Sequence, residues 1–400
     1  MTPSASARRR PAPVLIPYSP EQPVDPFAPP RAAYVHVPFC VHRCGYCDFT
    51  VVAGRDDLID VYLDALETEL SRLESPRPVD TLFLGGGTPT YLPVASLGRL
   101  LDLVSAWFPL SEGGEFSVEA NPLGLDDDKL ALLADRGVNR VSLGVQSFDA
   151  AALRLLERDH SSELARDRVL AARERFPECS LDLIFGVPGQ SRDDWQATLE
   201  TAVSLGPTHI SAYGLTFERG TAFWGRRLRG ELHQVGDDLE RAQYELAMEL
   251  LPARGYPQYE LSNYARPGHE SRHNAVYWAG GAYFGAGPGA ARYVGGVRET
   301  NHRSTTTWIR EVRSGRKPLS SSETLSPEER ARETLMLGLR RTAGVSRSAF
   351  QCQTGYELDA LAGRTIAHGV SHGLVEDDGS RITLTRAGRC VADSVIAEML

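Results

Sequence analysis

The sequence predicts an α/β protein: a partial (β/α)6 barrel followed by a smaller α+β domain of the winged-helix type. Six short apolar runs alternate with segments of helical periodicity, as in chains built from repeated β-α-β units. The 400 residues are enough to bury a barrel-sized core and a second, smaller core. The character of the chain changes after residue 310, where a polar, Ser-rich stretch over residues 318–323 predicts a linker.

The predicted strands cover residues 34–38, 81–84, 115–122, 140–147, 181–186 and 209–216. Apolar segments of helical periodicity lie between them, such as residues 58–73 and 129–135. Strands that alternate with helices form a parallel sheet through right-handed crossovers, and six units suit an open, partial barrel within residues 32–310. A doubly wound sheet is the alternative that this pattern leaves open.

Residues 325–400 predict the second domain. Ser326 is expected to cap a helix, with Pro327 at its first position and Glu329 completing a capping box. The predicted elements are this helix to about residue 340, two short helices over 345–370, a hairpin with a Gly turn over 375–384, and a last helix over 385–400. Helices followed by a β wing resemble a winged-helix module. Basic and acidic residues nearly cancel there, which favours partner docking over DNA binding.

Composition limits the classes of function. A net charge of −9 argues against general nucleic-acid binding, and no run of about 18 apolar residues is present to span a membrane. Residues 1–31 are rich in Pro, Ala and Arg and lack the apolar region of a secretory signal, so they predict a disordered lead-in. Cys179, Cys352 and Cys390 are scattered, which predicts free thiols and a cytoplasmic protein.

Three further thiols lie within eight residues, at Cys40, Cys44 and Cys47. Thiolates are soft ligands, and the spacing C-x3-C-x2-C lets one loop wrap a soft metal centre. A structural zinc ion takes four ligands, usually from two knuckles, and no second knuckle is present. A [4Fe-4S] cluster held by three cysteines would keep one iron free for a ligand that is not protein. A zinc loop and three unrelated buried thiols are the alternatives.

Polar residues and glycines follow the later strands at their C-terminal ends, where parallel barrels keep their chemistry. The glycines in residues 85–89 allow the backbone to approach a ligand closely. Glu119 can accept hydrogen bonds from ribose hydroxyls, and Arg158 can pair with a carboxylate. Gln146 and Asp182 also lie on these strands. Each residue alone could be an ordinary barrel residue, but together they predict a binding site.

The cysteine loop resembles that of radical S-adenosylmethionine (SAM) enzymes, in which an aromatic residue precedes the third cysteine. Tyr46 occupies that aromatic position, and its ring can stack on an adenine. The resemblance implies two cofactors, a [4Fe-4S] cluster on the three cysteines and SAM beside it.

Further runs are similar to the oxygen-independent coproporphyrinogen III oxidase family, a resemblance that covers about residues 32–400. These runs are residues 34–40, 85–90, 119–122 and 144–148. The resemblance implies that SAM is contacted by Tyr34, Gly86, Gly87, Thr88, Glu119, Gln146, Arg158, Asp182 and Thr216.

Two features depart from the oxidases. The oxidases have another cysteine two residues after the third motif cysteine, where this chain has Phe49. Residues 272–278 read Arg-His-Asn-Ala-Val-Tyr-Trp, and His-Asn-x-x-Tyr-Trp is similar to the mark of HemW-type heme chaperones. This branch resemblance implies that His273 contacts heme, because neutral imidazole binds heme iron and Tyr277 and Trp278 offer flat apolar surface. From the residues alone, a hydrogen-bonded loop histidine beside core aromatics is the alternative. The Gly-rich residues that follow, 280–289, predict an irregular connection.

These resemblances lead to two main hypotheses. In the first, the chain is a carrier that binds heme and passes it to heme-accepting proteins, respiratory and membrane-associated ones among them. The cluster and SAM would then be structural or regulatory elements, and a homodimer is compatible with this role. In the second, the chain is an enzyme that decarboxylates coproporphyrinogen III oxidatively, by radical chemistry that the cofactors supply. The motif around His273 and the replacement by Phe49 favour the carrier. A radical enzyme with another substrate is the remaining alternative.

Overall fold

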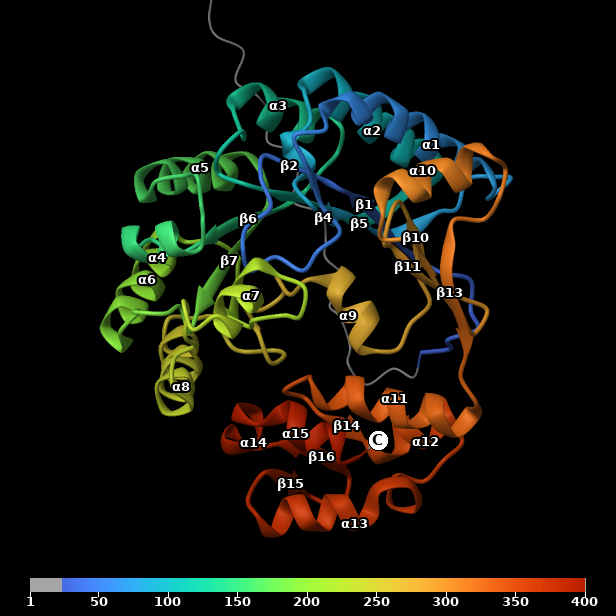
Figure 1. Ribbon diagram of the computed structural model, residues 1–400. Coiled ribbons are helices and arrows are strands. Elements are labelled where there is room, and N and C mark those ends of the chain that lie inside the picture. Colours follow the sequence, from blue (N-terminus) through green and yellow to red (C-terminus); the bar gives the residue numbers. More distant parts are fainter. Residues whose placement is uncertain (1–23, 400) are drawn as a thin grey trace, which may run out of the picture.

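The computed structural model describes residues 24–399, and its main part is an open, curved sheet of eight strands (Figure 1). Six neighbouring strands run parallel and follow the order of the chain. They are β1 (Ala32–Val37), β4 (Val79–Gly86), β5 (Leu110–Ala120), β6 (Arg140–Gln146), β7 (Glu178–Phe185) and β8 (His209–Gly214). The predicted partial barrel is confirmed, and the consecutive strand order excludes the doubly wound alternative.

Two short strands extend the sheet at its edges, and it does not close. β10 (Phe284–Ala286) lies parallel to β1, and β9 (Asn263–Ala265) lies antiparallel to β8. The prediction of an irregular connection over residues 280–289 is wrong, because β10 lies inside it. A Cβ atom on Gly285 would lie 1.9 Å from the carbonyl oxygen of Ala291. This glycine therefore permits close packing of two backbone segments.

Helices cover the outer face of the curved sheet, and both predicted helices, over residues 58–73 and 129–135, are present (Figure 1). Side chains cap several of them: Asp126 accepts the N–H of Lys129, and Ser191 forms a capping box with Asp194. The helices of the body are α1 (Ile59–Ser71), α2 (Val94–Trp107), α3 (Asp127–Asp135), α4 (Ala150–Leu155), α5 (Ser162–Arg175), α6 (Arg192–Leu205), α7 (Ala222–Leu228), α8 (Asp237–Ala253), α9 (Arg272–Trp278) and α10 (Thr305–Arg313), with 3-10 turns at η1 (Asp56–Leu58) and η2 (Pro89–Tyr91).

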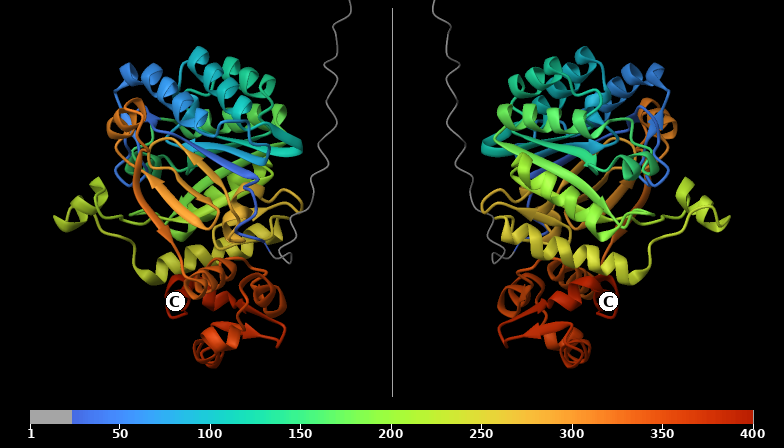
Figure 2. Two further views of the ribbon diagram at one scale, coloured as in Figure 1. Left: turned by 90° about the vertical axis from the view of Figure 1, so that its right-hand side faces the viewer. Right: turned by 90° about the vertical axis from the view of Figure 1, so that its left-hand side faces the viewer.

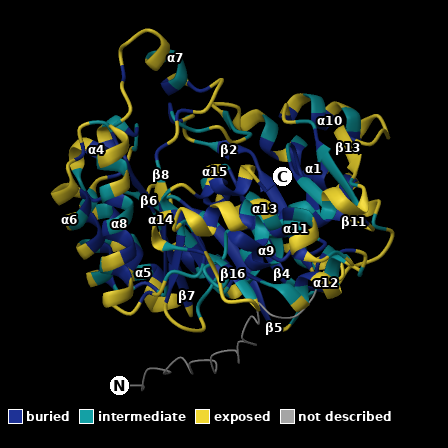
Figure 3. Cartoon of the chain, turned by 90° about the horizontal axis from the view of Figure 1, so that it is seen from below, coloured by how far each residue is buried: buried dark blue, intermediate teal, exposed yellow. Residues whose placement is uncertain are grey.

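Apolar side chains between the sheet and these helices form the core of the body. Trp195 and Trp308 are completely buried there, among leucines and valines of the strands and helices. Seen from below, buried residues follow the strands, and exposed residues lie mainly on outward helix faces and loops (Figure 3). No helix within residues 24–399 combines the length and the apolar composition that crossing a membrane requires.

A second, antiparallel sheet lies beside the body. It consists of β11 (Ala291–Val294), β12 (Val297–Asn301) and β13 (Leu319–Thr324). The prediction of a polar linker over residues 318–323 is wrong, because most of this segment forms β13 and pairs with β12. The serines of β13 are exposed and show no apolar alternation. The strand depends on backbone hydrogen bonds, which leave no pattern in the sequence.

The C-terminal domain lies below the body in Figure 1 and in both views of Figure 2, and it has an apolar core of its own. The capping box of Ser326 and Glu329 is present at the start of α11 (Pro327–Leu339). The predicted hairpin is also present, with Gly379 in the left-handed conformation, φ 83°, at its turn. The prediction of one last helix is wrong, because the helix is interrupted at Val391. The other elements are β14 (Val345–Ser346), α12 (Arg347–Thr354), α13 (Leu358–Ser371), β15 (Val375–Asp377), β16 (Arg381–Leu384), α14 (Arg386–Cys390) and α15 (Ala392–Ala397).

Most of the predicted lead-in, residues 1–31, lies outside the described residues. Its last part, residues 24–31, contacts both the C-terminal domain and the body. The guanidinium of Arg330 lies 4.8 Å from the centre of the Phe27 ring, and Arg31 pairs with Asp80 at 2.6 Å.

Helix α9 covers the end of the sheet at which the parallel strands begin. The carboxylate of Glu115 accepts the backbone N–H groups of Arg272 and His273, each at 3.1 Å. Arg140 donates to Glu115 at 3.1 Å and pairs with Glu178 at 3.5 Å. The side chains of Glu115 and Arg140 are 3% exposed. One buried guanidinium therefore pairs with two buried carboxylates. Glu115 holds the first turn of α9, and Glu178 also lies 2.9 Å from Nδ1 of His269.

We expect Arg140→Met to lower the free energy of unfolding by about 3–5 kcal/mol, because Glu115 would stay buried without a cation and Glu178 would keep only its contact with His269. Chemical denaturation followed by tryptophan fluorescence measures this loss. The control is Arg136→Met, which breaks an exposed pair with Asp102 and should leave the free energy of unfolding nearly unchanged. Equal losses in the two variants would contradict this role of the buried network.

Candidate functional site

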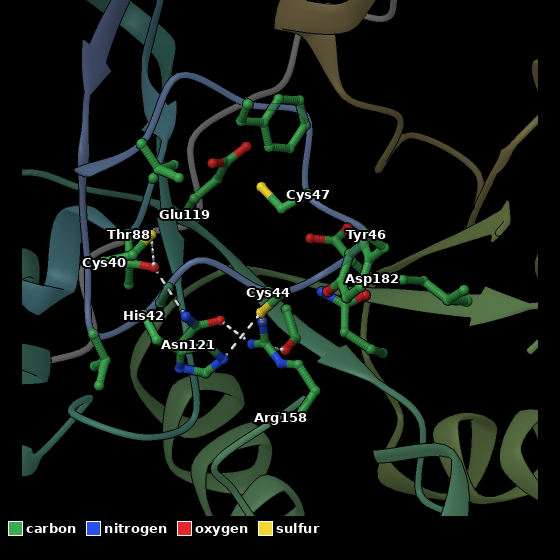
Figure 4. Close-up of a pocket in the computed structure, with 18 of the residues that line it drawn as sticks. Cys40, His42, Cys44, Tyr46, Cys47, Thr88, Glu119, Asn121, Arg158 and Asp182 are labelled. Atoms are coloured by element: carbon green, nitrogen blue, oxygen red, sulfur yellow. Dashed lines mark hydrogen bonds between the residues drawn. The ribbon is translucent and has the colours of Figure 1, made fainter. Parts of the chain in front are cut away.

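A cavity of about 740 Å3 opens where the parallel strands end (Figure 4). Its lining combines thiols, glycines, carboxylates and a guanidinium from separate segments of the chain. The predicted site residues found there are Cys40, Cys44, Tyr46, Cys47, Gly86, Gly87, Thr88, Glu119, Gln146, Arg158, Asp182 and Thr216. The structure thus brings together all predicted site residues except Tyr34 and His273.

The cysteine loop leaves the end of β1 and is tied at both of its ends. β2 (Phe39–Cys40) pairs with β3 (Val52–Ala53), so the loop between them is closed by a short parallel ladder. Inside the loop, the N–H of Cys47 donates to the carbonyl of Cys44 at 3.0 Å. The three thiols are separated along the loop and all border the same cavity (Figure 4).

The surroundings of the thiols fit a cluster with three protein ligands. Burial raises the pKa of Cys40 to about 11 and also raises the pKa of Cys47, so both thiols stay protonated until a metal displaces the protons. Arg158 donates to the sulfur of Cys44 at 3.7 Å. The described lining holds no fourth cysteine for zinc, and the imidazole of His42 beside Cys44 is already bonded to Glu157 and Asp159. A [4Fe-4S] cluster with one iron open to a non-protein ligand suits this donor set.

The glycines after β4 leave no room for side chains. Gly86 has φ 104°, and a Cβ atom there would lie 2.2 Å from the ring of His36. A Cβ atom on Gly87 would lie 2.7 Å from the carbonyl oxygens of Val37 and Phe39. The N–H of Gly86 donates to Glu119 at 2.9 Å. Bare backbone therefore forms this wall of the cavity, as the sequence predicts.

The polar lining of the cavity includes two buried carboxylates and one guanidinium. Burial, together with the charge of Asp182, raises the pKa of Glu119 to about 8. Burial raises the pKa of Asp182 to about 6, although Ser142 donates to it at 3.1 Å. Arg158 donates to the carbonyl of Gly144 at 2.9 Å. Such a cavity suits a ligand that carries cationic, hydroxyl and carboxylate groups together.

Gln146, Tyr46 and Thr216 complete the predicted part of the lining. The backbone of Gln146 has φ 65°, a strained conformation of the kind found at functional sites. The pairing of β6 with β7 is irregular just before this residue. The ring of Tyr46 packs edge-on against Phe223 of α7, with centroids 6.0 Å apart. Thr216 follows the end of β8 and is exposed at the cavity.

Tyr34 lies below the cavity rather than in its lining. Its hydroxyl is 3.0 Å from Nδ1 of His36, and its ring stacks on Phe83 with centroids 6.0 Å apart. It supports the strands β1 and β4, and a contact between Tyr34 and SAM stays a prediction.

His273 lies on α9, at the opposite end of the sheet from the cysteine loop, and is 1% exposed. Its Nδ1 is 2.9 Å from the hydroxyl of Thr81, and its Nε2 is 2.8 Å from the hydroxyl of Tyr277. Its ring stacks on Phe83 at 5.0 Å. Both ring nitrogens are therefore in use, as in the hydrogen-bonded alternative that the residues alone allowed.

Two residues with clear roles at the site were missed by sequence reasoning. Asn121 donates to the hydroxyl of Thr88 at 2.9 Å and accepts a hydrogen bond from Arg158. Its position two residues after Glu119, at the end of a strand, was a usable signal. Glu157 accepts the N–H of Gly45 at 2.7 Å. Nothing in the local pattern marks Glu157, because its partner is distant in the chain.

Comparisons with known proteins agree with this geometry. The model of the radical SAM superfamily matches residues 34–202, and the model of the HemN C-terminal domain matches residues 325–391. Among solved structures, the radical SAM enzyme coproporphyrinogen III oxidase (HemN) from Escherichia coli superposes with a TM-score of 0.81. The superposition covers 96% of this chain and 91% of the oxidase chain, at 25% sequence identity.

Curated relatives match along nearly the whole chain. The heme chaperone HemW of Bacillus subtilis is 38% identical over 375 residues, which is 92% of this chain and 99% of the relative. The heme chaperone HemW of Mycobacterium tuberculosis is 37% identical over 401 residues, which is 98% of this chain and 99% of the relative. Identity of this extent shows common family membership. The chain therefore belongs to the HemW family of the radical SAM superfamily.

Proposed function

We propose that this protein binds heme and passes it to heme-accepting proteins. The observation that carries the proposal is 38% identity with a heme chaperone along almost the full length of both chains. Phe49 adds support. It lines the cavity, and it occupies the sequence position at which the similar oxidases have another cysteine. Its apolar side chain is 65% exposed.

The proposal includes two cofactors in the cavity, as the radical SAM match over residues 34–202 supports. The three cysteines of the loop would hold a [4Fe-4S] cluster. When bound, the cluster supplies one iron that no protein ligand occupies. Arg158 would bind the carboxylate of SAM, and Glu119 and Asp182 would bind its cationic and hydroxyl groups.

We further propose that His273 contacts the heme iron. Burial lowers the pKa of His273 to about 4, so its imidazole is neutral near pH 7 and keeps a lone pair for a metal. The hydroxyl of Tyr277 engages Nε2 in the structure, so iron coordination requires that this hydrogen bond is released. The family motif supports the assignment, and the flat rings of Tyr277 and Trp278 lie on the same helix as His273.

Oxidation of coproporphyrinogen III is the second candidate function. The fold of the Escherichia coli oxidase covers 96% of this chain, and the cavity keeps the thiols and polar residues that the oxidase resemblance implies. Identity with that oxidase is 25%, against 38% with a heme chaperone, and Phe49 replaces a cysteine. These differences favour the carrier over the oxidase.

Heme titration of the anaerobically reconstituted protein tests the assignment of His273. We expect saturable binding near one heme per chain, and a Kd that is roughly tenfold higher or more in His273→Ala. Tyr277→Phe should bind at least as tightly as the wild type, because no hydroxyl competes for Nε2. The measurement is heme absorbance against added heme.

The control for this titration is His372→Ala, which removes an exposed histidine of the C-terminal domain. Its Kd should equal that of the wild type. Because the imidazole of His273 is already neutral above about pH 4, heme affinity should not fall between pH 8 and pH 6. Unchanged affinity in His273→Ala would place the heme elsewhere.

Removal of one cluster ligand tests whether cluster binding and heme binding are independent. We expect Cys44→Ala to reduce the iron content from about four atoms per chain to nearly none. Heme affinity should stay unchanged, because His273 lies at the other end of the sheet. Iron analysis and heme titration on one preparation measure both quantities. Cys352→Ser, at an exposed cysteine, is the control that should keep its iron. Loss of heme binding in Cys44→Ala would show that the sites depend on each other.

A further inference from the structure

Glu157 has a backbone conformation that is unfavourable for a residue with a side chain. It lies between the end of α4 and Arg158, with φ 54°. This left-handed region suits glycine, and other residues remain there only where surrounding contacts hold them. The contacts of Glu157 therefore show what the chain gains from this conformation.

Glu157 holds the middle of the cysteine loop with both its side chain and its backbone. Its carboxylate accepts the N–H of Gly45 at 2.7 Å, next to Cys44. Its carbonyl oxygen accepts a hydrogen bond from Nε2 of His42 at 2.6 Å, and the sulfur of Cys44 lies 3.8 Å from the same oxygen. Three residues of the loop, His42, Cys44 and Gly45, thus contact one residue.

The Glu157 carboxylate also lies near α7. Arg226 lies 3.8 Å from one of its oxygens. The N–H of Phe223 donates to the carbonyl of Gly45 at 2.8 Å, and Phe223 is fully buried. A Cβ atom on Gly45 would lie 2.6 Å from the ring of Phe223 and 2.9 Å from Glu157. The peptide of Gly45 is therefore held between Glu157 and α7, with no free space on either side.

We propose that Glu157 is a positioning residue that fixes the Cys44–Gly45 peptide, so that the three thiols face the cavity before the cluster binds. A ligand loop that is already ordered loses less conformational freedom when the metal centre binds. The left-handed backbone of Glu157 is the conformation that lets one residue reach the loop with both carbonyl and carboxylate. The inference rests on the cluster assignment made above and is independent of heme binding.

Two variants separate backbone strain from positioning. Glu157→Gly relieves the left-handed strain but removes the acceptor for Gly45, so we expect a melting temperature no lower than that of the wild type and roughly tenfold faster loss of the cluster to an iron chelator. Glu157→Gln keeps an oxygen that can accept the same N–H, so its cluster should be lost at nearly the wild-type rate. The measurements are thermal unfolding of the cluster-free protein and the decay of the cluster's visible absorbance.

The matched control is Glu74→Gly, because Glu74 also has a left-handed backbone, φ 64°, and is exposed and outside the cavity. It should keep the wild-type rate of cluster loss. Wild-type retention in Glu157→Gly would overturn the proposal, and so would equal damage in Glu157→Gln, which would show that charge and not hydrogen bonding matters. A wild-type protein that takes up no iron would instead overturn the cluster assignment on which the proposal rests.

Discussion

The shared direction of the six parallel strands is the constraint on which the rest of the structure depends. Because these strands all end at one edge, the cysteine loop, the glycines after β4 and the carboxylates Glu119 and Asp182 meet at one cavity. The same constraint places the beginnings of the strands at the opposite end of the sheet. There α9 covers the strands, and Glu115 and Arg140 form a buried pair. One sheet thus carries two regions of different chemistry.

The two regions share strands but no functional side chain. Phe83 of β4 stacks on both Tyr34 and His273, whereas Gly86 of the same strand borders the cavity. Three residues of an extended strand span roughly 10 Å. A heme bound at α9 would therefore be separated from the cofactor cavity by packed side chains on the inner face of the sheet, such as Phe83 and Tyr34. This separation agrees with a carrier in which the cluster and SAM do not react with the heme.

Much of the fold could be predicted because its signals are local. The six parallel strands and the capping box at Ser326 each depend on residues close together in the chain. The strands β10 and β13 could not be predicted, because three residues in a Gly-rich run and a row of exposed serines carry no apolar period. Both strands exist through backbone pairing with distant partners.

The candidate site divides in the same way. Cysteine spacing and strand-end positions identified most of the cavity lining, because parallel strands bring their ends together. The hydrogen bonds that enclose His273 come from Thr81 and Tyr277, and only the first of these is distant in sequence. The role of Glu157 depends on a loop more than a hundred positions away, so only the three-dimensional structure reveals it.

The most direct test offers coproporphyrinogen III to cluster-loaded, reduced protein with SAM, in a preparation shown to bind heme. Mass spectrometry of the porphyrin fraction is the measurement. For a heme carrier, the substrate mass should stay unchanged while heme remains bound near one per chain. A product that has lost two carboxyl groups, formed over many turnovers per protein chain, would show that the protein is an oxidase. That result would contradict the carrier function.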